Sequence, residues 1–117
     1  MKRILVVDDK EEVRMVYTLL FSDDEMDVVE AEDGLVALDI VKTEPIDLVL
    51  SDCKMPRMSG IELMAEAQKI KPKLPFIFVS ANVREENLGQ LEPFSIIPKP
   101  FNLGDLKIAV QRALNES

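Results

Sequence analysis

Five residues whose side chains can bind ions or take part in group transfer follow apolar runs that lie far apart in the sequence. They comprise three carboxylates, one hydroxyl and one ammonium, namely Asp8, Asp9, Asp52, Ser80 and Lys99. Oxygen ligands of this kind favour Mg²⁺ or Mn²⁺ over zinc. Because the chain contains no histidine, any site has to be built from carboxylates, hydroxyls, lysine and backbone groups. The set therefore predicts a divalent-cation site that also holds a nucleophile.

The three carboxylates would repel one another if they met without a counterion. Two unit charges about 4 Å apart interact by about 4 kcal/mol at an effective dielectric constant near 20. At least one carboxylate would then take up a proton, unless a divalent cation neutralised the group. With the metal in place, one carboxylate can attack phosphorus, and Asp52 is the candidate because it stands alone at the end of a central strand. Lys99 could pair with one phosphoryl oxygen, and the Ser80 hydroxyl could donate to another.

Each of these residues also has an ordinary structural explanation when it is taken alone. An aspartate that ends a strand is usually a turn residue, and Asp8 and Asp9 could cap the helix that follows them. Ser80 would usually be a turn residue, and Lys99 a solvated side chain. We prefer the functional interpretation because the predicted topology brings all of them to one edge of a sheet.

Apolar runs predict the strands, and apolar stripes predict the helices between them. The strands are expected at residues 4–7, 27–31, 46–50, 76–79 and 95–97. The helical positions expected to form apolar stripes are Val13, Val16, Tyr17 and Leu20, then Leu35, Leu38 and Val41, then Leu63, Ala67 and Ile70, and finally Leu103, Leu106, Val110 and Leu114. A capping box at residues 59–62 opens the third helix, and Pro72 closes it. A fourth helix, opening at residues 82–85, has only a poor stripe.

This alternation is a (βα)₅ pattern of the α/β class. Right-handed crossovers should build a doubly wound parallel five-stranded sheet with helices on both faces. In such sheets, ligands bind outside the carboxyl ends of the strands. The five residues named above follow those ends, so we expect them to converge on one crevice.

The length, charge and composition of the chain exclude several classes of protein. A chain of 117 residues suits one domain, and the formal charge of −8 argues against direct nucleic-acid binding, which needs a basic face. One cysteine, Cys53, permits no internal disulfide and is expected to be a small buried hydrophobe. No apolar run approaches the length of a membrane span, and the N-terminus lacks a signal peptide core. We therefore expect no membrane insertion and a cytoplasmic location.

The motifs "ILVVDD", "DLVLSDCKMPRMSGIEL", "FIFVSA" and "PKPF" occur in this order across essentially the whole chain. Together they resemble the receiver domain of bacterial two-component response regulators. The resemblance implies a flavodoxin-like fold with strand order 2-1-3-4-5. It also implies that residues 1–117 form a single receiver domain without an output domain.

The resemblance further implies a role for each site residue. Asp52 would be the phosphoacceptor, taking a phosphoryl group from the phosphohistidine of a sensor histidine kinase or a histidine phosphotransfer protein. Mg²⁺, or Mn²⁺ in its place, would be held by Asp9, Asp52 and the backbone carbonyl of Lys54, and by Asp8 mainly through water. Ser80 would bind the phosphoryl group and move with it, Lys99 would pair with it, and Pro100 would follow a cis peptide bond. Phosphorylation would then alter the binding of a downstream protein.

Three departures from the family pattern fall on its usual output face. Ile96 stands where the family usually has tyrosine or phenylalanine, so the expected coupling between the switch residues Ser80 and Ile96 lacks its aromatic partner. The segment from Ser80 to Lys99 is about three residues shorter than usual. Pro98 precedes the lysine and cannot donate a backbone hydrogen bond. We expect intact phosphoacceptance with an unusual output.

Three other functions compete with this interpretation. A phosphohydrolase of the haloacid-dehalogenase type uses similar residues, but in a different order: its acidic pair comes late, and a second aspartate follows the nucleophile where this chain has Lys54. A flavodoxin-like nucleotide-binding module would need a phosphate-binding loop after the first strand, where "DDKEEV" is acidic. A pseudo-receiver would be a binding scaffold without phosphorylation, which the complete set of five residues argues against.

Overall fold

Strands and helices alternate along the chain. The computed structural model describes residues 1–22, 26–82 and 87–116. Its elements are β1 (Arg3–Val7), α1 (Glu11–Ser22), β2 (Asp27–Ala31), α2 (Gly34–Thr43), β3 (Leu48–Asp52), α3 (Gly60–Ile70), β4 (Phe76–Ser80), β5 (Ser95–Pro98) and α4 (Leu103–Glu116). All strand pairs are parallel and the order is β2-β1-β3-β4-β5. The predicted fold class and strand order are confirmed.

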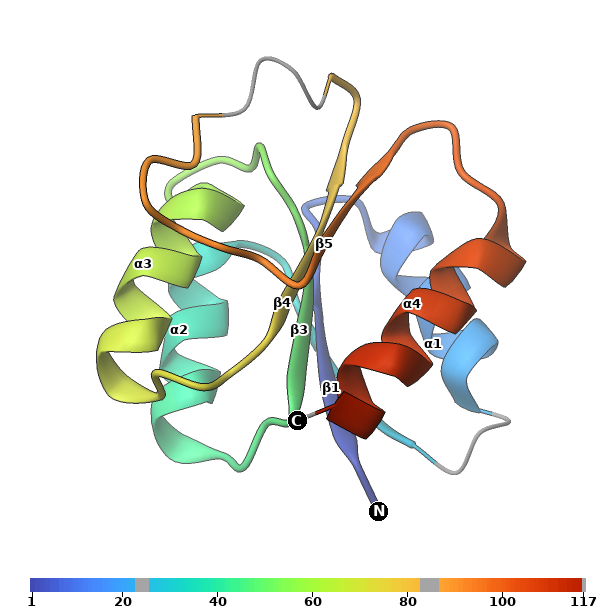
Figure 1. Cartoon of the computed structure of the whole chain (residues 1–117), viewed down its shortest axis with the longest axis horizontal. Helices are drawn as coiled ribbons and strands as arrows, with labels where there is room; N and C mark the ends of the chain where they lie inside the picture. The colour runs from blue at the N-terminus through green and yellow to red at the C-terminus, as the bar shows by residue number, and fades with distance from the viewer. Residues whose placement is uncertain (23–25, 83–86, 117) are drawn as a thin grey trace.

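The sheet separates two helical layers, and each layer has its own core. α2 and α3 cover one face, whereas α1 and α4 cover the other (Figure 1). Successive residues of a strand point to opposite faces, so Leu5 and Val7 of β1 belong to the core under α2 and α3, and Ile4 and Val6 to the core under α1 and α4. Burial of both faces explains why the strands read as continuous apolar runs.

Some stripe positions predicted from spacing are exposed. Ile70 is the last residue of α3 and Leu103 the first of α4, and their exposed fractions are 45% and 43%. Terminal turns have fewer packing neighbours than the middle of a helix, so these two core predictions are wrong. Val16 and Leu35 are also exposed. The buried side of α1 is centred on Tyr17, and that of α2 on Ala37 and Val41, so Val16 and Leu35 lie at the edges of these narrow buried faces.

The helix predicted between β4 and β5 is not found in the described residues. Residues 83–85 of its predicted start lie outside them, and residues 87–94 contain no helix. Gly89 adopts a positive φ of 59°, which suits a turn. Leu88 and Leu91 nevertheless pack against the core that α2 and α3 cover. The described part of the chain thus holds four helices, none of them long and apolar enough to cross a membrane.

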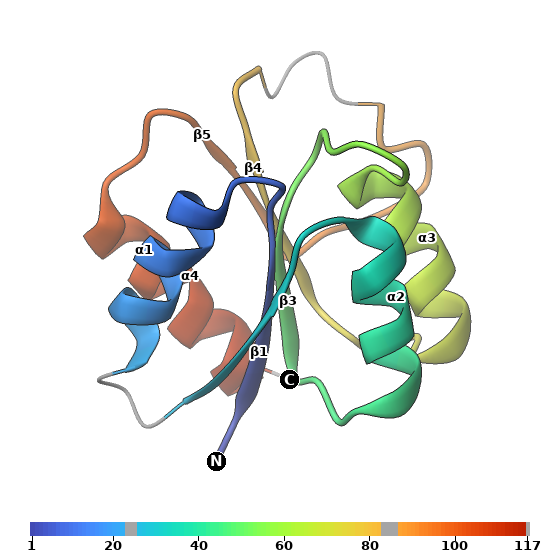
Figure 2. The ribbon, with the colours of Figure 1, turned by 180° about the vertical axis from the view of Figure 1, so that it is seen from behind.

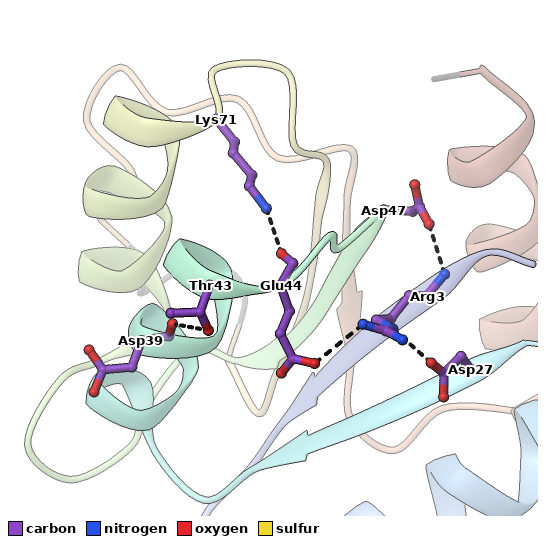
Figure 3. A network of polar contacts seen from close by, with 7 residues as sticks. All are labelled: Arg3, Asp27, Asp39, Thr43, Glu44, Asp47 and Lys71. Atoms are coloured by element: carbon purple, nitrogen blue, oxygen red, sulfur yellow. Dashed lines mark hydrogen bonds and ion pairs between the residues drawn. The ribbon is translucent and has the colours of Figure 1, made fainter.

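A polar network ties the elements together at the amino ends of the strands (Figure 3). The Arg3 side chain donates from Nε to Asp27 Oδ2 at 2.7 Å and from Nη1 to Glu44 Oε1 at 3.3 Å. The Arg3 backbone N–H donates to Asp47 Oδ2 at 2.8 Å, and Lys71 Nζ donates to the Glu44 carbonyl at 2.7 Å. These contacts join β1, β2, the start of β3 and the end of α3. Arg3 and Asp27 begin β1 and β2, and Asp47 precedes β3, so the network lies at the end of the sheet opposite the carboxyl ends of the strands. Figures 1 and 2 show the N-terminus at this end, next to the start of β1.

Candidate functional site

The register of the sheet places the predicted site residues side by side. Val7 pairs with Ser51 and Val79 with Asp52, so Asp8 leaves β1 next to the end of β3. Ser80 pairs with Pro98, so Lys99 follows β5 next to the end of β4. Because the strands are parallel, all of these ends share one edge. The register therefore brings the strand ends at which the five residues stand to one edge of the sheet.

The three carboxylates form a compact cluster. One oxygen from each of Asp8, Asp9 and Asp52 lies within 4.8 Å of the others. Asp8 is buried, with 1% of its surface exposed, whereas Asp9 is exposed and Asp52 is intermediate. This gradient leaves the cluster open on the side of Asp9. Three oxygen donors around an open position fit a hard cation such as Mg²⁺, which keeps several waters.

The pKa of Asp8 is raised above its ordinary value of 3.8. Burial is the main cause, and the negative charges of Asp52 and Asp9 act in the same direction, while a hydrogen bond from the Lys10 backbone and the charge of Lys99 oppose them. The Lys10 amide donates to Asp8 Oδ1 at 2.9 Å. This direction agrees with the expectation that, without a cation, one of the three carboxylates holds a proton more readily.

Both oxygens of Asp52 have contacts on the protein. Lys99 Nζ lies 3.3 Å from Oδ2, and the Lys54 backbone N–H donates weakly to Oδ1 at 3.4 Å. The Asp52 side chain is 15% exposed, so it is held in the crevice and still reachable. The contact with Lys99 puts a positive charge where a negatively charged group on Asp52 would need one.

Ser80 and Lys99 are joined through the backbone. The Lys99 N–H donates to the Ser80 carbonyl at 2.8 Å, and Ser80 Oγ accepts from the Asn82 N–H at 3.1 Å. The peptide bond between Lys99 and Pro100 is cis, as predicted. Ile96 is partly buried against the core that α2 and α3 cover, and its predicted role as a switch residue stays a prediction.

The segment after β3 packs closely against the strand that precedes it. The Gly60 N–H donates to the Cys53 carbonyl at 3.0 Å. A Cβ at Gly60 would lie 2.1 Å from the Asp52 carbonyl oxygen, so only glycine fits there. The Ser59 hydroxyl and the Glu62 carboxylate form the predicted capping box that begins α3. Cys53 is 1% exposed, which confirms it as a buried residue.

Sequence reasoning missed three residues around the site. Arg14 Nη1 donates to the Asp8 carbonyl at 2.6 Å and so supports the end of β1. Tyr17 is buried and its ring stacks on Phe101, with centroids 6.4 Å apart, and burial followed by the charges of Asp8 and Asp52 raises the pKa of its hydroxyl. Arg57 pairs with Asp33 at the start of α2. No local pattern could have identified these contacts, because each partner lies in another segment of the chain.

Comparisons with known proteins agree on one protein family for this chain. A model described as the response regulator receiver domain matches residues 4–111. The sporulation initiation phosphotransferase F of Bacillus subtilis (strain 168) is 34% identical, and the match covers 97% of this chain and 94% of that protein. The sensor kinase CckA of Brucella abortus (strain 2308) is 35% identical, but this chain spans only 12% of its length.

A solved structure shares the fold of this chain. The response regulator protein TrrA from Thermotoga maritima, in complex with Mg(2+)-BeF, superposes with a TM-score of 0.89 at 32% identity, covering 97% of this chain and all of that one (100%). The family match extends from β1 into α4 and thus includes every residue of the site. This chain belongs to the response regulator receiver domain family.

Proposed function

We propose that Asp52 is the phosphoacceptor of a two-component or phosphorelay signalling module formed by residues 1–117. The observation that carries the proposal is the position of Asp52, whose carboxylate belongs to the acidic cluster with Asp8 and Asp9 and also lies 3.3 Å from Lys99 Nζ. Its partial exposure supports access by an incoming phosphoryl group. The family and the complex of TrrA with Mg(2+)-BeF support the same chemistry.

Asp8, Asp9 and Asp52 would hold Mg²⁺, with Mn²⁺ as a substitute, and the Lys54 carbonyl would complete the protein ligands. The separation of the three carboxylate oxygens, within 4.8 Å of one another, supports this assignment. The cation would neutralise the repulsion within the cluster and draw negative charge from a phosphoryl oxygen. Lys54 belongs to the same short segment as Asp52, and its N–H already contacts the Asp52 carboxylate.

In the proposed step, an Asp52 carboxylate oxygen forms a bond to phosphorus as the phosphorus–nitrogen bond of a phosphohistidine breaks. The bonding electron pair returns to the imidazole nitrogen, which then takes up a proton. Lys99 would follow the developing charge because its ammonium is already directed at Asp52. The Ser80 hydroxyl, 2% exposed at the end of β4, would donate to a phosphoryl oxygen.

The phosphodonor would be a sensor histidine kinase or a histidine phosphotransfer protein. The names of two relatives, a phosphotransferase and a sensor kinase, support this class of partner. An apolar groove of about 450 Å³ beside the site is lined by Glu12, Val13, Val16, Tyr17, Lys99, Pro100 and Phe101. Lys99 belongs to both the groove and the site, so a protein seated in the groove would approach Asp52. Val16→Asp should therefore slow phosphorylation by a protein donor and leave phosphorylation by a small donor unchanged.

The phosphorylated state would alter binding of a downstream protein partner rather than of nucleic acid, because the net charge is −8. We place the module in the cytoplasm, where such kinases deliver their phosphoryl groups. It would catalyse only its own phosphorylation and dephosphorylation and would not turn over a substrate. The loss of an aromatic at Ile96 supports an output that differs from the family's usual one.

The proposal is tested by incubating the protein with Mg²⁺ and a small phosphodonor such as phosphoramidate. We expect a base-labile adduct of one phosphoryl group, absent from Asp52→Asn and from samples with EDTA. Asp39→Asn, at an exposed position of α2, is the matched control and should react like the natural protein. Absence of any adduct would favour a binding scaffold, and steady turnover of a generic phosphate ester would favour a phosphohydrolase.

A further inference from the structure

We propose that Arg57 is a positioning residue for the phosphoacceptor site: by pairing with Asp33 at the start of α2, it holds the segment 53–59 in the conformation that orients Asp52 and its metal. This inference rests on the proposed function of Asp52. Arg57 contacts neither the carboxylate cluster nor Lys99 within the described residues. Its influence would therefore pass through the backbone.

The first observation is the contact itself. Arg57 Nη2 donates to Asp33 Oδ2, and the two residues are 24 positions apart in the sequence. The Asp33 side chain is 7% exposed, whereas that of Arg57 is 54% exposed. The second carboxylate oxygen of Asp33 accepts from the Val36 N–H at 2.9 Å and caps α2. One buried carboxylate thus fastens the segment after β3 to the first turn of α2.

The second observation is the backbone of Arg57, whose φ is 69°. The left-handed region is unfavourable for a residue with a Cβ, and glycine is the usual choice there. A turn alone would be better made by glycine. An arginine in this conformation indicates that its side chain contributes something a glycine would lack, and strained backbone of this kind persists only where the surrounding contacts hold it.

The third observation is that the segment 53–59 is held in close backbone contact on two sides, by α2 and by the end of β3. Toward α2, a Cβ at Gly34 would lie 2.6 Å from the Met58 carbonyl oxygen, so the two backbones are in close contact. Toward β3, the Gly60 N–H donates to the Cys53 carbonyl at 3.0 Å. Between these contacts lies Lys54, whose N–H reaches Asp52 Oδ1 at 3.4 Å. A shift of the segment would move Lys54 and turn the Asp52 carboxylate.

The charge of Arg57 stabilises the ionised form of Asp33, even though Asp33 is buried. Burial by itself raises the pKa of Asp33, but hydrogen bonds from the Val36 amide and from Arg57, together with the charge of Arg57, outweigh burial and lower it. The carboxylate is therefore charged at neutral pH and continues to attract the guanidinium. Groups that orient a ligand set from outside it commonly change metal affinity when they are removed.

Arg57→Gly separates positioning from mere support of the fold. It removes the guanidinium and at the same time relieves the left-handed backbone, so the urea midpoint should stay close to that of the natural protein. We expect Mg²⁺ affinity, measured by calorimetry, and the rate of phosphorylation by phosphoramidate each to fall by about tenfold. Hydrogen exchange at the Lys54 amide should become faster. Arg57→Lys should recover most of both losses, and Asp33→Asn, which keeps the oxygen that caps α2, should reproduce them.

Lys69→Ala is the matched control, because it breaks an exposed ion pair with Glu66 on α3 that does not touch the segment. It should leave Mg²⁺ affinity and phosphorylation unchanged. The proposal is overturned if Arg57→Gly keeps both within twofold of the natural protein, or if Arg57→Lys fails to restore them. Should the natural protein itself accept no phosphoryl group, the proposed function fails. The Mg²⁺ and hydrogen-exchange measurements would then still decide whether Arg57 positions the segment.

Discussion

Replacing Asp8 with asparagine should stabilise the metal-free protein at neutral pH. The substitution removes one of three clustered negative charges and keeps the oxygen that accepts from the Lys10 amide at 2.9 Å. In the folded protein the pKa of Asp8 is raised above 3.8, chiefly by burial and then by the neighbouring charges. Ionising Asp8 therefore costs more in the folded state than in the unfolded chain. That cost is absent below the unfolded pKa, grows as the pH rises from the unfolded pKa to the raised folded one, and is complete above it.

The size of the effect follows from the geometry of the cluster. Two carboxylate charges at the 4.8 Å limit of the cluster repel by about 3.5 kcal/mol at an effective dielectric constant near 20. Lys99 opposes the repulsion at Asp8, and solvent screens the exposed Asp9. After these reductions we expect a gain of about 1–2 kcal/mol in the free energy of unfolding. Mg²⁺, which binds the folded state, should stabilise the natural protein and have much less effect on Asp8→Asn.

Urea denaturation followed by circular dichroism measures both quantities, since the chain contains no tryptophan. The free energies of the two proteins should coincide at acidic pH and diverge as the pH rises through the titration of Asp8, in samples with EDTA. Excess Mg²⁺ should narrow or reverse the difference at neutral pH. A variant that is less stable than the natural protein in EDTA at neutral pH would refute the reasoning, because repulsion within the cluster would then not be a net cost.

Three further substitutions test other parts of the account. Gly60→Ala should lower the free energy of unfolding by about 3 kcal/mol, because the new Cβ would lie 2.1 Å from the Asp52 carbonyl oxygen. If the variant unfolds in urea with the same free energy as the natural protein, β3 and α3 can move apart at little cost. We expect the exposed Lys54 side chain to screen the phosphoryl group from attacking water, so Lys54→Ala should shorten the lifetime of the phosphorylated protein. An unchanged dephosphorylation rate would show that Lys54 has no such role. Arg3→Ala should lower the free energy of unfolding by about 1 kcal/mol, and by less at high salt. Phosphorylation should be unaffected, because the network in Figure 3 lies at the other end of the sheet. Reduced phosphorylation would indicate that the two ends of the sheet are coupled.

The strand pattern and the identity of the site residues could be read from the sequence because both are local. Burial on two faces makes each strand a continuous apolar run, and a polar residue directly after such a run must lie at a strand end. Topology then brings those ends to one edge. Helix faces were harder to predict, since apolar spacing marks a stripe without saying where packing stops, as Ile70 and Leu103 illustrate.

The sequence by itself determined the α/β alternation, the acidic pair after β1 and the positions of Asp52, Ser80 and Lys99 at the strand ends. Only the tertiary structure decided the register that sets Val7 beside Ser51 and Ser80 beside Pro98. It also decided that Asp8 is buried while Asp9 is exposed, and that Arg57 reaches Asp33 across 24 positions. The physical reason is that apolar runs and turn residues act between neighbours in the chain. Burial, ion pairing and pKa depend instead on which distant backbones pack together.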